Sequence, residues 1–219
     1  MMREVDGWFD SIRTRYATEM QCGRGCALCC HGLFDISLPD AVRVAEAFGR
    51  LPGEVRTSVE GRAAEIQSVI EWEAPELRSP CLLNVVPEER IDRIVENAGS
   101  PRCPFLGEHA ECLIYDNRPM ACRLEDVPMV DLQDGLFGDW CELNFTSGVS
   151  EQALRDLGRD YYGMQKVEEA ATESLSKTLL GEKLSAATVF IPSLVVEFDR
   201  FWKLRIADLK TPSGSVEPI

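Results

Sequence analysis

Hydrophobic residues recur at helical spacing along most of the chain. Within residues 5–20, the side chains of Phe9, Ile12 and Tyr16 fall on one helical face, because positions three and four apart lie above one another. This stripe predicts an amphipathic helix that ends before the glycine-rich sequence following it. The same reasoning predicts five further helices, over residues 38–51, 54–73, 87–99, 150–180 and 193–209.

Strand patterns are few and short, over residues 33–36, 113–115 and 188–191. Ser37 is placed to cap the helix that follows the first of them. Residues 126–141 combine Gly and Asp turn signals with little periodicity, so we expect an irregular loop there. The pattern predicts a mainly α fold, an irregular helical domain with few short strands.

The composition fits one globular domain over residues 1–219. Hydrophobic residues make up 45% of the chain and charged residues 27%, so a core can form without disulfides. The N-terminal sequence lacks the basic and apolar regions of a secretory signal. The most apolar stretch, residues 185–198, is interrupted by Ser and Pro and is too short to span a bilayer. These features predict a cytoplasmic protein.

The formal net charge of −14 limits the classes of partner. A strongly acidic chain is repelled by nucleic-acid phosphates and by anionic membrane surfaces. The sequence therefore predicts neither a nucleic-acid partner nor a membrane partner.

Nine cysteines are the most informative residues of the chain. The segment "QCGRGCALCCHG", residues 21–32, holds four of them within nine positions. In a reducing compartment such a cluster favours metal binding or redox chemistry over disulfides, and thiolates suit zinc, Cu(I) and iron–sulfur clusters. Cys81 stands apart and fits a buried structural thiol. The predicted metal ligands are the other eight, Cys22, Cys26, Cys29, Cys30, Cys103, Cys112, Cys122 and Cys141.

Two of these cysteines, Cys29 and Cys30, are neighbours. Successive side chains diverge by about 100° on a helix and about 180° on a strand, so one ion does not readily take both. Either one of the two is not a ligand, or they serve different metal atoms. Eight thiolates are enough for two four-coordinate sites, or for one four-iron cluster and a second metal.

Arginines and histidines near the cysteines have two possible roles each, one at a metal site and one purely structural. Four arginines, Arg24, Arg102, Arg118 and Arg123, could neutralise thiolate charge or could be ordinary surface residues. His31 could be a ligand, although a surface or core histidine is the more common case. His109 lies in a predicted turn, and we expect it to have a structural role and not to bind metal.

The cysteine pattern resembles a known family. The elements "CGRGCALCC", "CPFL" (103–106) and "CLIYDNRPMACR" (112–123) resemble those of the bacterial cysteine-cluster proteins described as zinc- or iron-chelating. The resemblance covers residues 20–145 and implies a cysteine-rich metal-binding core there. The C-terminal helices over 150–210 lie outside it, and their apolar residues are expected to pack on this core, the alternative being that they dock a partner or a second copy. The family is distantly similar to the core of flagellin lysine-N-methylase, but no glycine-rich S-adenosylmethionine loop is present here.

Two functional hypotheses follow, and no catalytic residue is identified for either. The first is a redox or electron-transfer protein with an iron–sulfur cluster. Under this hypothesis the chain acts as an oxidoreductase and has a redox protein as its partner. The second is a non-enzymatic zinc protein with a structural or metal-handling role. The spacing from Cys22 to Cys29 also occurs in radical S-adenosylmethionine enzymes, but their strand–helix alternation is missing.

Overall fold

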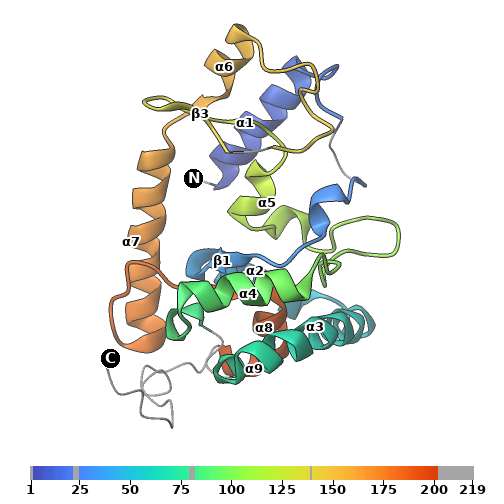
Figure 1. The fold of residues 1–219 in the computed structure, drawn as a ribbon, viewed down its shortest axis with the longest axis vertical. Coiled ribbons are helices and arrows are strands. Elements are labelled where there is room, and N and C mark those ends of the chain that lie inside the picture. Colours follow the sequence, from blue (N-terminus) through green and yellow to red (C-terminus); the bar gives the residue numbers. More distant parts are fainter. Residues whose placement is uncertain (1, 22–24, 79–81, 139, 202–219) are drawn as a thin grey trace. The chain divides into compact units, whose positions relative to one another are not determined.

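The computed structural model describes residues 2–21, 25–78, 82–138 and 140–201. Helices dominate it, and the strands are short, as the sequence predicts (Figure 1). The described helices are α1 (Met2–Arg15), α2 (Leu38–Arg50), α3 (Gly53–Glu73), α4 (Glu88–Ala98), α5 (Met120–Leu124), α6 (Glu151–Leu157), α7 (Tyr161–Leu180), α8 (Ile191–Val196) and α9 (Phe198–Phe201). The described strands are β1 (Asp35–Ser37), β2 (Met129–Asp131), β3 (Gly135–Phe137), β4 (Gly158–Arg159) and β5 (Thr188–Phe190).

The chain divides into two compact units. The first unit contains Met1–His31 and Phe105–Glu168, and the second contains Gly32–Pro104 and Glu169–Ile219. Each has its own hydrophobic core. The predicted metal-binding core over 20–145 draws on sequence from both units, and the prediction of a single domain over 1–219 stays a prediction.

The first unit is built around α1. Its apolar stripe, the one read from the sequence, is buried against residues from the second half of the unit. A three-stranded sheet of order β3-β2-β4 joins the same core, with β2 antiparallel to β3 and parallel to β4. The buried core consists of Phe9, Ile12, Tyr16, Met20, Val127, Val130, Phe145, Ala153 and Leu157.

In the second unit, α3 packs against α4 and against α8, and it lies beside each of them in Figure 1. Strands β1 and β5 pair antiparallel, with Ile36 opposite Val189. Inside the unit, the Ser193 hydroxyl donates to Gln67 Oε1 at 2.7 Å, which satisfies two buried polar groups. The core residues are Leu33, Ile70, Ala74, Leu77, Leu83, Val86, Ile94 and Phe190.

Several predicted elements are confirmed at close to their predicted bounds. The helix predicted over 54–73 is α3, and the one over 87–99 is α4, which ends at Gly99 with a φ of 65° that favours glycine. Strand β5 falls within one residue of the predicted one, and β1 begins two residues later and ends one residue later than predicted. Ser37 occupies the predicted N-cap position, but its hydroxyl makes no capping bond to any described residue.

Other predicted elements are wrong. Residues 126–141 contain the β2–β3 hairpin instead of an irregular loop, and residues 113–115 lie in turns and a 3-10 helix instead of a strand. The helix predicted over 150–180 is two helices, because residues 158–159 form β4 and pair with β2. The last predicted helix breaks between α8 and α9, and its part beyond residue 201 lies outside the described residues.

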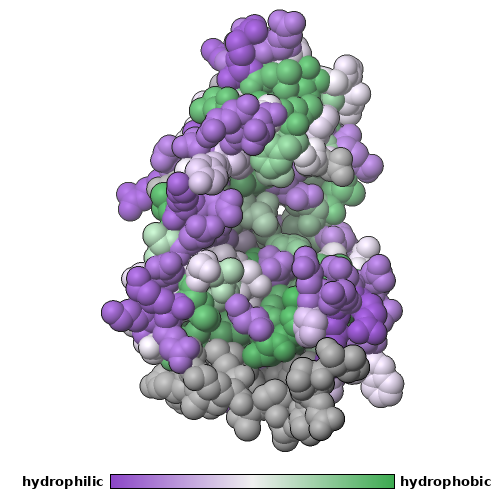
Figure 2. Space-filling view, turned by 60° about the vertical axis from the view of Figure 1, so that its left-hand side comes forward, coloured by the Kyte–Doolittle hydropathy of each residue, from purple (hydrophilic) through white to green (hydrophobic). Residues whose placement is uncertain are grey.

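Hydrophilic residues cover much of the described surface in Figure 2, and hydrophobic residues reach it between them. The exposed hydrophobic side chains include Trp72 on α3 and Phe137 on β3. Among the described residues, no helix combines the length and apolar character needed to cross a bilayer.

Candidate metal centre

The structure places most of the predicted ligands in the first unit, and the described cysteines carry thiols. Cys103 belongs to the second unit, two residues before the chain enters the first again. Cys22 and Cys81 lie outside the described residues. The ligands described in the first unit are Cys26, Cys29, Cys30, Cys112, Cys122 and Cys141, of which Cys141 is buried and the others are half-buried.

The neighbouring thiols of Cys29 and Cys30 contact each other. They lie in the 3-10 helix η1 (Leu28–Cys30), where the Cys30 N–H donates to the Ala27 carbonyl at 3.0 Å. The hydrogen bond with Cys30 raises the pKa of Cys29, and burial and the negative charges of Asp126 and Glu125 raise it further. This turn therefore does not force the two sulfurs apart as a regular helix or strand would, and the raised pKa of Cys29 favours its protonated form.

Arg123 fixes the segment between Cys112 and Cys122. This guanidinium, 2% exposed, donates from Nε to the Arg118 carbonyl at 3.0 Å and from Nη2 to the Asp116 carbonyl at 2.9 Å. Its Nη1 pairs with the Asp6 carboxylate on α1. Burial lowers the pKa of Arg123, and the contact with Asp6 compensates for the buried charge. The described contacts of Arg123 are thus with carbonyls and a carboxylate, and they organise the motif instead of neutralising sulfur.

Arg118 links an aromatic contact to a buried carboxylate. Its guanidinium carbon lies 4.4 Å from the centre of the Tyr115 ring and 5.6 Å from that of Phe9. Its Nη1 lies 3.8 Å from Oδ2 of Asp126, which is buried directly after α5. Since the charge of Asp126 also acts on Cys29, Arg118 offsets part of the negative charge beside the neighbouring thiols.

Asn144 connects three cysteine-bearing segments within the first unit. Its side-chain oxygen accepts the N–H of Gln21 at 2.8 Å, next to Cys22, and its Nδ2 donates to the Asp126 carbonyl beyond α5. Its own N–H donates to the Cys141 carbonyl at 2.9 Å. With only 1% of its surface exposed, Asn144 makes these bonds away from water, where an unpaired group is costly.

A second backbone contact supports the same convergence. The N–H of Cys141 donates to the carbonyl of Glu125 at 3.1 Å, which holds Cys141 against the C-terminal end of α5. The Trp140 indole N–H donates to the carbonyl of Asn144 at 3.0 Å and closes the turn around Cys141. Segments that are more than a hundred residues apart in sequence therefore share one hydrogen-bonded framework.

Asn144, Asp126 and Asp6 were not identified from the sequence. A polar residue between two apolar ones, as in the run Leu143 to Phe145, is the only sequence signal for a buried amide at position 144. Asp6 gives no signal at all, because its partner Arg123 is more than a hundred residues away.

The donor set fits a thiophilic metal. Thiolates are soft ligands for zinc or iron, and the side chains of His31 and His109 are exposed. Among the described residues, which exclude Cys22, no three Cys, His, Asp or Glu side chains are grouped closely enough to hold an ion. The hydrogen bonds of Asn144 and Cys141 bring the cysteine-bearing segments of the first unit together.

The comparisons with known proteins agree with this donor chemistry. Residues 21–142 match the family model CxxCxxCC, described as "Putative zinc- or iron-chelating domain". This match covers more than half of the chain, and the chain belongs to that family. The comparison with curated proteins gives no match, and neither does the comparison with solved structures. Metal binding through the cysteine cluster is the property that the family description supports, and it names zinc or iron.

Proposed function

We propose that this chain is a redox or electron-transfer protein that holds an iron–sulfur cluster with its cysteines. The observation that supports this most strongly is the Asn144 framework, which joins the segments next to Cys22, Cys122 and Cys141. Structural zinc sites are commonly built from two local Cys pairs, whereas a dense local run of cysteines completed by a distant one is a known iron–sulfur pattern. When bound, such a cluster supplies one-electron chemistry.

The roles of individual residues follow from their surroundings. Cys26, Cys29, Cys30, Cys112, Cys122 and Cys141 are the ligands proposed from the described part of the first unit. Cys22 and Cys103 complete the set predicted from the sequence and stay predictions. Arg118, Arg123 and Asn144 position these segments, and the buried Ile114 and Phe105 beside them limit the access of water.

Zinc is the second candidate, because the family description names either metal. In that case the four-coordinate ion closes the cysteine segments without redox chemistry, and the chain has a structural or metal-handling role. An electron-transfer role also requires a redox protein partner, whereas a zinc protein needs no such partner.

Metal analysis of protein purified without air distinguishes the two. We expect iron, acid-labile sulfide and visible absorption from the wild-type chain. The variants Cys29→Ser and Cys122→Ser are expected to lose at least half of the iron, whereas Cys81→Ser, a matched control, keeps it. Colourless protein with stoichiometric zinc and no iron would remove the redox proposal.

The neighbouring thiols need a test of their own. Cys29→Ser and Cys30→Ser are compared singly for metal content under the same conditions. If both variants retain all of the wild-type metal, neither thiol is an essential ligand, and the idea that the two serve different metal atoms fails.

A further inference from the structure

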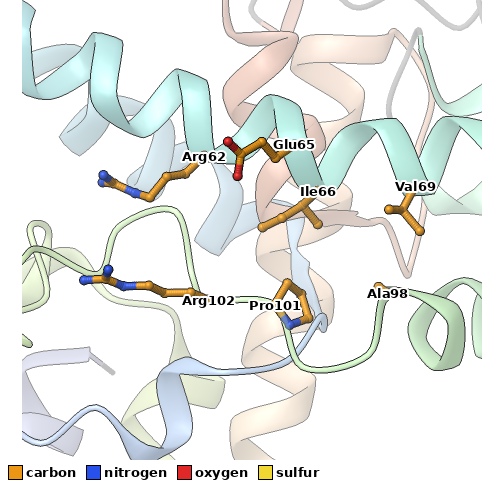
Figure 3. Close-up of a pocket in the computed structure, with 7 residues that line it drawn as sticks. All are labelled: Arg62, Glu65, Ile66, Val69, Ala98, Pro101 and Arg102. Atoms are coloured by element: carbon orange, nitrogen blue, oxygen red, sulfur yellow. The ribbon is translucent and has the colours of Figure 1, made fainter.

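A cleft of about 450 Å³ lies within the second unit, between α3 and the segment that follows α4. Its size falls in the usual range of small-molecule sites. Helix α3 forms one wall and residues 98–102 form the other, as Figure 3 shows. The seven lining residues are Arg62, Glu65, Ile66, Val69, Ala98, Pro101 and Arg102.

Charged and apolar residues occupy different ends of this cleft. Figure 3 shows the side chains of Arg62 and Arg102 extending in the same direction from opposite walls. Ile66 and Val69 on α3 face the wall formed by Pro101 and Ala98 at the other end. A ligand that fits both ends has an anionic group joined to an apolar group.

Arg62 is held in place before any ligand binds. Its Nε and Nη2 donate to the carbonyl of Pro104 at 2.9 and 2.7 Å, and its Nη1 donates to the Ser58 hydroxyl at 2.7 Å. A guanidinium has five N–H donors, so further donors remain for a ligand carboxylate. Because the side chain is already ordered, binding does not have to fix its rotamers.

The negative charge of Glu65 restricts which ligands fit the cleft. It lies on α3 between Arg62 and the apolar residues, and its carboxylate is on the cleft side of the helix in Figure 3. A simple fatty carboxylate would meet repulsion there, whereas a ligand with an ammonium group beside its carboxylate would be attracted. An apolar side chain on the same molecule would then lie along Ile66 and Val69.

We infer that this cleft is a binding site for a free α-amino acid with a large apolar side chain, such as leucine. Arg62 and Arg102 bind the carboxylate, Glu65 binds the ammonium group, and the apolar end takes the side chain. The inference does not depend on the metal proposed for the cysteines, since every residue of the cleft lies in the second unit.

Calorimetric titration of the full chain tests the inference with four probes. These are L-leucine, 4-methylpentanoate (leucine without its amino group), 3-methylbutylamine (leucine without its carboxylate) and glycine. We expect leucine to bind at least tenfold more tightly than each of the other three, because each lacks one of the three recognised groups.

Charge-neutral variants assign the contacts. Glu65→Gln is expected to remove the preference for leucine over 4-methylpentanoate, and Arg102→Gln is expected to weaken both ligands alike. Glu60→Gln, on another face of α3, is the matched control and should leave leucine binding unchanged. Circular dichroism confirms that each variant is folded.

Three results would overturn the inference. They are no heat of binding with leucine up to millimolar concentration, equal binding of leucine and glycine, or the same loss of affinity in Glu60→Gln as in Glu65→Gln.

Discussion

At the scale of single residues, the buried side-chain amide of Asn144 holds the cysteine-bearing segments of the first unit together. Thiols scattered over the chain need their backbones brought together before they can share a metal. Asn144 accepts from Gln21 and donates to the carbonyl of Asp126, two bonds that hold the cysteine segments from opposite sides. An amide accepts with one atom and donates with another, whereas an ionised carboxylate only accepts.

Replacing Asn144 with Ala should therefore weaken both the fold and the metal site. The Gln21 N–H and the Asp126 carbonyl lose their partners in a region where water has little access, and such losses cost about 3 kcal/mol together. We expect a corresponding decrease in the free energy of unfolding in urea, with lower metal content per chain at equal protein concentration.

Asn97→Ala is the control for this change. Asn97 is exposed on α4 and donates to Glu73 Oε1 at 2.9 Å, so its loss is expected to change stability by less than about 0.5 kcal/mol. Wild-type stability and metal content in Asn144→Ala would show that the amide does not organise the site.

At the scale of elements, Asp131 explains why the sequence pattern over 150–180 is not one helix. Its Oδ1 accepts the N–H groups of Gln133 and Asp134 in the hairpin turn, and its Oδ2 accepts the Tyr161 N–H at the start of α7 at 3.0 Å. One carboxylate thus closes the β2–β3 turn and begins a helix. These backbone bonds lower the pKa of Asp131 below that of a free aspartate.

Asp131→Asn should lower the midpoint of urea unfolding at neutral pH, because an amide presents one acceptor oxygen in place of two. A carboxyl whose pKa is depressed in the folded state stabilises above its unfolded pKa of about 3.9, and this stabilisation is lost as pH falls through the folded value. The difference in midpoint between wild type and variant is therefore expected to persist at pH 7 and to shrink below about pH 4. A difference that stays constant from pH 7 down to acid denaturation would contradict the role of the charged form.

The same element shows how far sequence reasoning extends. Periodicity identifies α3 and α4 well, because a helix that covers a core must repeat its apolar residues every three to four positions. It fails over 150–180, where the apolar spacing continues from Leu157 to Tyr161 across β4 although the backbone leaves the helix. The contact at the start of α7 comes from Asp131, thirty residues before Tyr161, and no local pattern indicates such a partner.

For the metal centre too, local sequence predicts some features, and others depend on residues far away in the chain. Thiol chemistry is local, so the cysteines are identifiable as ligands from their identity and spacing. The arrangement around them depends on Asn144, Arg123 and Asp6, whose partners lie far away in sequence. The contact between Cys29 and Cys30 likewise depends on the exact backbone of η1, and regular helix or strand geometry does not anticipate it.

At the scale of the whole molecule, the two units differ in what stabilises them. The second unit has a core of buried apolar residues from α3, α4 and β5, together with the buried pair Gln67 and Ser193. In the first unit, the cysteine segments are mostly turns and short helices, a kind of local structure that opens at lower free energy than core helices. A bound metal is therefore expected to stabilise these turns far more than the helices of the second unit.

Hydrogen exchange measured by mass spectrometry tests this difference on the complete chain. After removal of the metal with a chelator, we expect faster amide exchange in residues 25–31, 112–127 and 140–148, because a ligand that binds only the ordered turns adds to their protection. Amides of α3 and α4 should exchange at the same rate with and without metal, since their protection comes from the core of the second unit. Restoring the metal should reverse the change in the three segments. If α3 and α4 lose protection to the same extent as the cysteine segments, the metal stabilises the chain as one cooperative body, and the division of stability argued from the two cores is wrong.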